Sequence, residues 1–302
     1  MAFIRGFGSW LPSRVVTNEE IGERVGREAS WIREVSGIEQ RRWGAPEDTV
    51  VAMGAKAGQD CMKLSGATLD EVGLVIVSTG SHDTRFPGAA AEIAHAIGLA
   101  GIPAIDVPVA SAGSLFGLTL ASQLVDKYRN ILVIASEKMS SVIDRDPSTA
   151  ILFGDGAGAC LVSADKGKMR ILDSVLHSDG SFAAELMLPL DGPLTMNGMS
   201  VIMQASRKVP AVILELLDKQ RRTAAEIGLF VMHQANQNLI LRIAKTLGVA
   251  SEKFYSNINR CGNTSSASML IAAAECWTSA TSICFAAFGA GYHWGALLAE
   301  TD

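Results

Sequence analysis

Residues 102–128 have the sequence IPAIDVPVASAGSLFGLTLASQLVDKY and contain one strand-to-helix unit of an α/β protein. The apolar run at 102–107 predicts a buried strand, and the leucine and alanine spacing of 111–128 predicts an amphipathic helix. Ser111 stands where these two elements meet. A side chain there lies beside the free N–H groups of the first helical turn, whose dipole stabilises negative charge. The position suits a nucleophile, although serine at a helix start is also a common capping residue.

Strands and helices alternate on both sides of this unit. In the first half, apolar runs predict strands at 72–78, 131–136 and 157–162, and an alanine-rich stretch predicts a helix at 87–99. The second half follows the same order, with strands predicted at 169–176, 229–232, 281–288 and 294–299 and helices at 201–219, 237–247 and 265–277. The repeat concerns element order alone, because no sequence repeat of fixed period is visible. The alternation of strands and helices predicts an α/β fold. A polar turn at 163–168 predicts the boundary between an N-terminal half at 1–165 and a C-terminal half at 166–302.

The composition is that of a compact enzyme, with 48% hydrophobic and 19% charged residues and a formal net charge of −5. No lysine or arginine run offers a surface for a phosphate backbone, so nucleic-acid binding is not expected. The first residues lack the order of a signal peptide, and no stretch approaches about 18 uncharged apolar residues. We therefore expect a cytoplasmic protein that does not bind membranes.

The five cysteines show neither C-x-x-C spacing nor an even count. A disulfide framework and a zinc cluster therefore have little support, and we expect free thiols and no metal site.

Two further positions carry side chains suited to chemistry. His233 follows the apolar run 229–232, at the carboxyl end of a predicted strand, where ligands gather in α/β sheets. Asn263 lies in a turn before the predicted helix at 265–277, where capping chemistry would also explain it. A structural histidine is the corresponding alternative for His233. The glycine-rich stretch 154–158 precedes a strand rather than following one, which excludes a dinucleotide-binding loop.

Taken together, residues 109–113 (VASAG), 233–236 (HQAN) and 262–266 (GNTSS) resemble the active-site set of the ketoacyl synthase III family, a branch of the thiolase-fold condensing enzymes. Further stretches match along the chain, namely Gly6 to Pro12, Trp31-Ile32, 36–38, Phe86-Pro87, 153–158, 196–198 and 294–296. The resemblance implies a duplicated five-layer αβαβα fold and a homodimer. It also implies a coenzyme A or phosphopantetheine thioester as substrate, with no further cofactor, and an acyl carrier protein as partner.

The resemblance assigns roles to individual residues. Ser111 falls on the acylated cysteine of the family, while His233 and Asn263 fall on the pair that stabilises the enolate formed by decarboxylating a malonyl thioester. Backbone N–H groups of Ser111 and Ala290 match the oxyanion hole. The implied substrate-binding residues are Trp31, which would stack on the coenzyme adenine, Phe86, which would reach the partner's acyl pocket, and Met196, Asn197 and Gly198. Val35 and Asn238 stand where the family has arginines around the entrance.

Serine changes the chemistry expected at the nucleophile position. A cysteine thiol is already partly ionised near neutrality, whereas a serine hydroxyl needs a base to attack, and His233 is the matched residue able to act as one. The resulting oxygen ester is attacked less readily by a carbon nucleophile than a thioester is, so condensation should be slow.

Three interpretations follow from this substitution. The chain is an acyltransferase that takes an acyl group from acyl-coenzyme A or a carrier protein and transfers it or condenses it with a malonyl thioester. Alternatively, it is an ordinary synthase whose cysteine was replaced to trap a complex, or a silent partner subunit. Retention of His233 and Asn263 argues against the silent subunit. Acyl-chain length and the choice between fatty-acid and secondary-metabolite pathways stay open.

Overall fold

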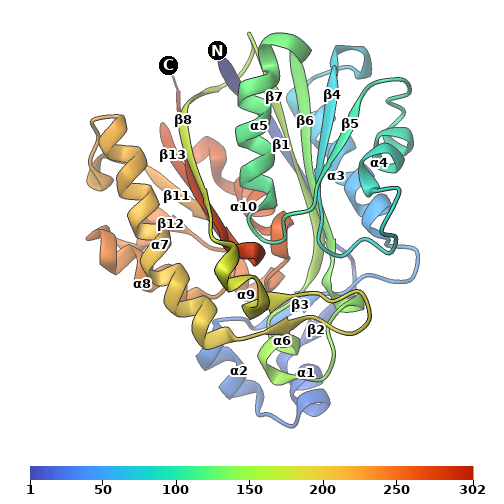
Figure 1. Cartoon of the computed structure of the whole chain (residues 1–302), viewed down its shortest axis with the longest axis vertical. Coiled ribbons are helices and arrows are strands. Elements are labelled where there is room, and N and C mark those ends of the chain that lie inside the picture. Colours follow the sequence, from blue (N-terminus) through green and yellow to red (C-terminus); the bar gives the residue numbers. More distant parts are fainter. Residues whose placement is uncertain (302) are drawn as a thin grey trace.

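The computed structural model describes residues 1–301, and a sheet of ten strands runs through its centre (Figure 1). The first half of the chain contributes β1 (Ala2–Trp10), β4 (Leu74–Ser78), β5 (Ala104–Val107), β6 (Asn130–Lys138) and β7 (Asp155–Ser163). The second half contributes β8 (Met169–Ser178), β11 (Leu229–Met232), β12 (Phe254–Tyr255), β13 (Ser282–Gly289) and β14 (His293–Glu300).

The two halves of the sheet have the same topology. Outward from the centre, the first half runs β1-β7-β6-β4-β5 and the second runs β8-β14-β13-β11-β12. In both, the two inner pairings are antiparallel and the two outer pairings are parallel. The antiparallel pair β1–β8 joins the halves. The repeat of element order is therefore a repeat of strand topology. The predicted boundary at residues 165 and 166 lies in the connection between β7 and β8, and one sheet continues across it.

Helices form three further layers (Figure 1). The helices α3 (Val50–Ser65) and α4 (Ala89–Ile97) pack on the outer face of the first half, and α7 (Gly198–Lys219) and α8 (Gln237–Leu247) on that of the second. Between the halves lie α5 (Gly113–Tyr128) and α10 (Ser268–Cys276), which share one core with strands of both. Side chains that alternate along a strand serve both faces, since Leu132 of β6 packs in the outer core and Val133 in the central core. The five layers agree with the predicted fold.

Short elements gather at one end of the sheet, at the bottom of Figure 1. They are β2 (Val15–Thr17), β3 (Gln40–Arg42), α1 (Asn18–Val25), α2 (Ala29–Ser36), α6 (Pro147–Ala150), β9 (Leu186–Met187), β10 (Thr195–Met196) and α9 (Ile258–Cys261). Several of them share a small core that includes Val16, Ile32, Phe153 and Leu186. Short 3-10 segments connect the larger elements at Leu69–Glu71, Met139–Ser141, Gly180–Glu185, Ala224–Glu226, Ser251–Lys253, Ser265–Ala267, Trp277–Ser279 and Ala290–Tyr292.

Three sequence predictions need correction. The strand predicted as buried at 102–107 is β5 at the sheet edge, where Ile105 is 43% exposed. The helix predicted from residue 111 begins at Gly113, so Ser111 precedes it. The helix predicted at 265–277 is a 3-10 turn followed by α10, because Ser265 has a positive φ of 46° that an α-helix cannot contain. Among the described residues, no helix combines the length and apolar character needed to cross a bilayer.

Close packing of α3 on β1 gives a test of the fold. A Cβ atom at Gly8 would lie 2.2 Å from the backbone nitrogen of Cys61 and 2.8 Å from the carbonyl oxygen of Ala57. Backbone atoms of a packed helix cannot yield, so Gly8→Ala should lower the free energy of unfolding by about 2 kcal/mol or more in urea titrations. Gly180→Ala is the matched control, because nothing lies within 4 Å of its Cβ position. Equal stabilities of the two variants would contradict the close packing.

Candidate active site

Ser111 lies in a strained turn between β5 and α5. Its φ is 63°, in the left-handed region that non-glycine residues rarely adopt, and such strain persists only where the surroundings impose it. The Ser111 N–H donates to Ser265 Oγ at 3.1 Å. Ala112 occupies the N-cap position of α5, and no side chain caps the helix there. The capping interpretation of Ser111 is therefore wrong, and its hydroxyl has no hydrogen-bond partner in the described chain.

Gly289, at the end of β13, holds this turn from the other half of the protein. A Cβ atom there would lie 2.1 Å from the carbonyl oxygen of Ala110, 2.7 Å from the nitrogen of Ala112 and 3.0 Å from Ser111 Cβ. Only glycine permits such an approach of two backbones. The position of Ser111 is thus set by a direct contact between the two halves.

His233 follows β11 and is 7% exposed. Its backbone N–H donates to the Ala286 carbonyl at 2.8 Å, and its ring Nδ1 lies 2.6 Å from Ser268 Oγ. Burial lowers the pKa of His233 to about 4, and hydrogen bonding with the Ser265 backbone acts in the opposite direction. The imidazole is therefore neutral at pH 7. Ser268 engages Nδ1, and no side chain in the described residues bonds Nε2.

Asn263 is fixed through both its backbone and its side chain. Its N–H donates to Leu152 O at 2.8 Å, and its carbonyl accepts from Gly154 N at 3.0 Å. Asn263 Oδ1 accepts from the Ser265 N–H at 2.9 Å, which settles the orientation of the amide. The side chain thus forms a local turn, as the capping alternative expected, but Nδ2 has no partner in the described chain and remains a donor.

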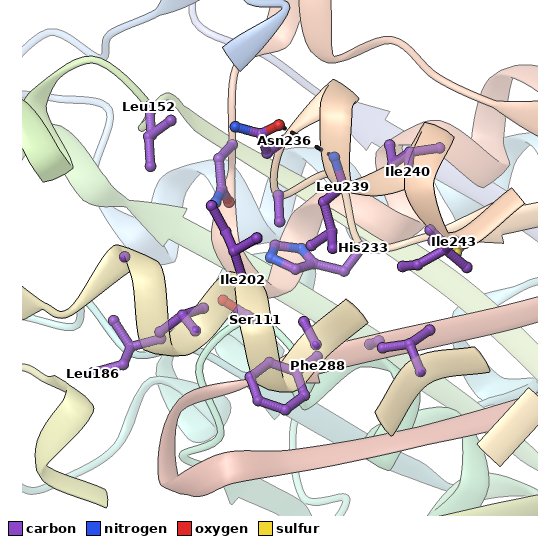
Figure 2. Close-up of a pocket in the computed structure, with 18 of the residues that line it drawn as sticks. Ser111, Leu152, Leu186, Ile202, His233, Asn236, Leu239, Ile240, Ile243 and Phe288 are labelled. Atoms are coloured by element: carbon purple, nitrogen blue, oxygen red, sulfur yellow. Dashed lines mark hydrogen bonds between the residues drawn. The ribbon is translucent and has the colours of Figure 1, made fainter. Parts of the chain in front are cut away.

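These three residues line one pocket between the sheet and the helices α7 and α8. Figure 2 shows Ser111 and the His233 ring facing the same space, with Ile202, Leu239 and Phe288 around it. Most other lining side chains are apolar, including Val209, Met232, Ile240 and Ile243. The structure therefore brings together the three residues that sequence reasoning placed in one site, in surroundings suited to an acyl chain.

A second, smaller cavity also reaches Ser111. Its lining is mainly apolar and comprises Gly80, Ala110, Met139, Val142, Phe153, Leu186, Leu188, Leu194, Ser265 and Ala290. Ala290, predicted to contribute an oxyanion-hole N–H, thus lies near Ser111. The Ser111 N–H itself is bonded to Ser265 Oγ, so its role in an oxyanion hole stays a prediction.

The predicted substrate-binding residues divide into two groups. Met196 and Gly198 line the main pocket, whereas Asn197 lies outside its lining and caps α7, its Oδ1 accepting from Ser200 N at 3.2 Å. Trp31 is 37% exposed on α2 and borders a separate surface hollow, with the Arg27 guanidinium 5.3 Å from its ring centre. Phe86 is 86% exposed and lines neither cavity. Within this single chain, Asn197, Trp31 and Phe86 do not reach the pocket.

Sequence reasoning missed Glu137, a fully buried carboxylate in β6. Its Oε1 accepts from Ser266 Oγ at 2.6 Å and from Ser266 N at 3.3 Å. Its Oε2 accepts from Ser81 Oγ at 2.6 Å, Gly80 N at 3.0 Å and Thr79 Oγ1 at 3.3 Å. The carboxylate thus ties the loop after β4 to the segment that carries Asn263. A single glutamate in the apolar stretch 131–137 was the available signal.

No cysteine offers an alternative nucleophile. All five are buried free thiols. Cys261, two residues from Asn263, has its pKa raised to about 11 by burial, so it is a thiol at neutral pH. Within residues 1–301, no cluster of histidine, cysteine, aspartate and glutamate could hold a metal ion.

Comparison with known proteins identifies relatives over the whole chain. The family 3-oxoacyl-(acyl-carrier-protein) synthase III matches residues 105–180, and its C-terminal region matches residues 217–301. The chain is 35% identical to the β-ketoacyl-(acyl-carrier-protein) synthase III of Acidiphilium cryptum over 314 aligned positions, covering 98% of both proteins.

Solved structures agree with this similarity. The synthase III of Aquifex aeolicus VF5 superposes with a TM-score of 0.96 at 32% identity, covering 99% of this chain and 100% of that one. The priming β-ketosynthase of the R1128 polyketide pathway superposes with a TM-score of 0.93 at 30% identity, covering 100% and 97%. The predicted thiolase-like fold is confirmed.

The lowered pKa of His233 predicts a specific pH dependence of stability. Between pH 6.5 and about 4 the unfolded chain binds a proton at this residue and the folded chain does not, so acidification favours unfolding. Stability should fall by about 1.4 kcal/mol per pH unit from this group in that window and not above it. His233→Gln should therefore lose about 2 kcal/mol less than the parent between pH 7 and pH 5 in urea titrations. Identical losses in the two proteins would contradict burial of a neutral imidazole.

Proposed function

Because the chain belongs to the 3-oxoacyl-(acyl-carrier-protein) synthase III family of acyl-transferring condensing enzymes, we propose that Ser111 accepts an acyl group from a coenzyme A or carrier-protein thioester. The acyl group then passes to an acceptor, by direct transfer or by condensation with a malonyl thioester. The observation that carries this proposal is the convergence of Ser111, His233 and Asn263 on one apolar pocket.

Acylation begins with removal of the hydroxyl proton. Ser111 Oγ attacks the thioester carbonyl carbon while its proton passes to His233 Nε2. The carbon–sulfur bond then breaks, and the thiolate takes the proton from Nε2 as it leaves. Three features of the site support this step: the neutral imidazole, the absence of a side-chain partner at Nε2, and a Ser111 hydroxyl that no helix cap engages.

Condensation uses the same residues differently. Loss of carbon dioxide from a malonyl thioester leaves an enolate, whose oxygen needs hydrogen-bond donors in a site of low polarity. Asn263 Nδ2 is one such donor, because Oδ1 is held by Ser265. His233 Nε2–H is the second. The enolate carbon then attacks the acyl carbon, the ester carbon–oxygen bond breaks, and Ser111 Oγ leaves as an alkoxide that takes up a proton from solvent. Because an oxygen ester is the less reactive partner, this half should be slower than acylation.

Beside the pocket, Arg207 and Arg242 are better placed than Asn238 to bind a phosphate. Asn238 Nδ2 donates to the carbonyls of Glu34 and Val35 at 3.0 and 3.2 Å, so it joins α8 to α2 and is not free for a phosphate. Arg207 and Arg242 lie in a shallow hollow that shares Ile202 with the pocket lining, and neither forms an ion pair within the described chain. These two guanidinium groups suit the phosphate of a carrier-bound arm.

A homodimer is the proposed assembly. Strand β5 leaves one side of the sheet unpaired, with Ile105 43% exposed, and Phe86 is 86% exposed nearby in the chain. An exposed edge of this kind pairs readily with a second copy. Pairing there would cover Ile105 and offer Phe86 to the partner.

The edge strand provides a test of the dimer. Ile105→Asp should convert a dimer to a monomer in sedimentation velocity, because a charge would be buried at the pairing edge. Leu64→Asp, at an exposed position near the end of α3, is the control and should stay dimeric. A parent that sediments as a monomer would overturn the proposed assembly.

Acylation itself is tested by intact-protein mass. Incubation with acyl-coenzyme A or acyl-carrier-protein donors should add one acyl group to the parent and none to Ser111→Ala. Ser111→Cys should become acylated faster and gain decarboxylative condensation with malonyl thioesters, because a thiolate needs less help from a base. No mass gain with any donor would favour a silent subunit.

A further inference from the structure

Ser268, the first residue of α10, is the side chain that holds the ring of His233. Its Oγ lies 2.6 Å from His233 Nδ1 and also accepts the backbone N–H of Gln234 at 3.0 Å. The residue is 2% exposed and does not line the pocket. Its hydroxyl therefore lies behind the pocket lining, and His233 is the lining side chain that it contacts.

The hydrogen-bond inventory of Ser268 limits what it can do. A hydroxyl has one donor hydrogen and two acceptor lone pairs. The Gln234 N–H uses one lone pair, which leaves one lone pair and the hydrogen for Nδ1. With Nδ1 protonated, Ser268 accepts and Nε2 is left with a bare lone pair. With Nδ1 bare, Ser268 donates and Nε2 carries the proton.

We propose that Ser268 is a positioning residue that holds the His233 ring through Nδ1 and accepts from Nδ1–H when Nε2 acts as the base for Ser111, an inference that rests on the proposed acyl transfer. As Nε2 takes the Ser111 proton, the ring becomes an imidazolium in a buried site. Its Nδ1–H then donates to Ser268 Oγ, which stabilises the charge without moving a further proton. When the thiolate takes the proton from Nε2, the ring returns to its starting state.

A hydroxyl suits a histidine with two tasks. A carboxylate in this place would only accept and would hold the proton on Nδ1 throughout. The Ser268 hydroxyl can also donate to a bare Nδ1, so it does not exclude the Nε2–H state that stabilises an enolate. The dependence on Ser268 should be specific to acylation of a hydroxyl, because a thiolate nucleophile demands less of the base.

A double-mutant cycle on the full chain separates this role from a structural one. Acylation rates with acyl-coenzyme A or acyl-carrier-protein donors are followed by quenched-flow mass measurement in the parent, Ser268→Ala, Ser111→Cys and the double variant. Ser268→Ala should slow acylation about 100-fold in the Ser111 protein, in the range of general-base effects, and less than about tenfold in the Ser111→Cys protein. Equal slowing in both backgrounds overturns the inference.

Ser266→Ala is the matched control. Ser266 lies in the same segment, is fully buried and bonds Glu137, so its loss removes comparable buried hydrogen bonds without touching His233. Its effect on acylation should be the same with either nucleophile. A parent that gains no acyl group, while Ser111→Cys does, overturns the proposed function of Ser111 and with it this inference.

A measurement on the parent alone does not depend on how the variants fold. Nitrogen-15 NMR of the His233 ring at pH 7 should show the proton on Nδ1 and a bare Nε2. A proton fixed on Nε2 in the free protein overturns the role assigned to Ser268.

Discussion

The contact between Gly289 and the turn at Ala110–Ala112 is the constraint on which the site depends. It presses the end of β13 from the second half against the turn that carries Ser111 in the first half, at distances that leave no room for a Cβ atom. Within this turn Ser111 has a left-handed φ, and its N–H donates a hydrogen bond to the Ser265 hydroxyl. The duplicated topology matters for the site because it brings β13 of the second half against this turn of the first half.

The segment from Asn263 to Ser268 provides the second half of the frame. Within six residues it places a donor in the pocket through Asn263, holds Ser111 through Ser265, meets the buried Glu137 through Ser266 and fixes His233 through Ser268. A buried carboxylate without a cation is costly unless its lone pairs are satisfied, and Glu137 accepts five hydrogen bonds from two loops. Such a network has few alternative arrangements, so Ser111, His233 and Asn263 have little freedom to separate.

Apolar runs and their order predicted the strands around which the site is built, because these are local signals, whereas the five-layer fold was implied by the family resemblance. Sequence reasoning missed β1 and α3. In β1, Gly6 and Gly8 interrupt the apolar pattern, and Gly8 is required because α3 packs directly on its backbone. Sequence reasoning also predicted β5 as a buried strand, because an isoleucine in an apolar run does not distinguish an edge strand from a central one. The roles of Ser265 and Ser268 were beyond its reach, since the Ser111–Ser265 bond joins residues 154 positions apart and the His233–Ser268 bond joins residues 35 apart.

The lowered pKa of His233 favours one use of Ser111 over another. A base with a pKa of about 4 is unprotonated at neutral pH, yet it is weak, and on driving force alone it would activate a hydroxyl poorly. The burial that weakens it also strengthens every charge interaction formed during reaction, so an imidazolium beside an oxyanion is stabilised more than it would be in water. The gain is greatest when both charges form together, as they would in the proposed attack on a thioester. In the proposed condensation the histidine stays neutral and only donates a hydrogen bond, so burial of His233 assists acylation of Ser111 more than it assists the later carbon–carbon bond formation.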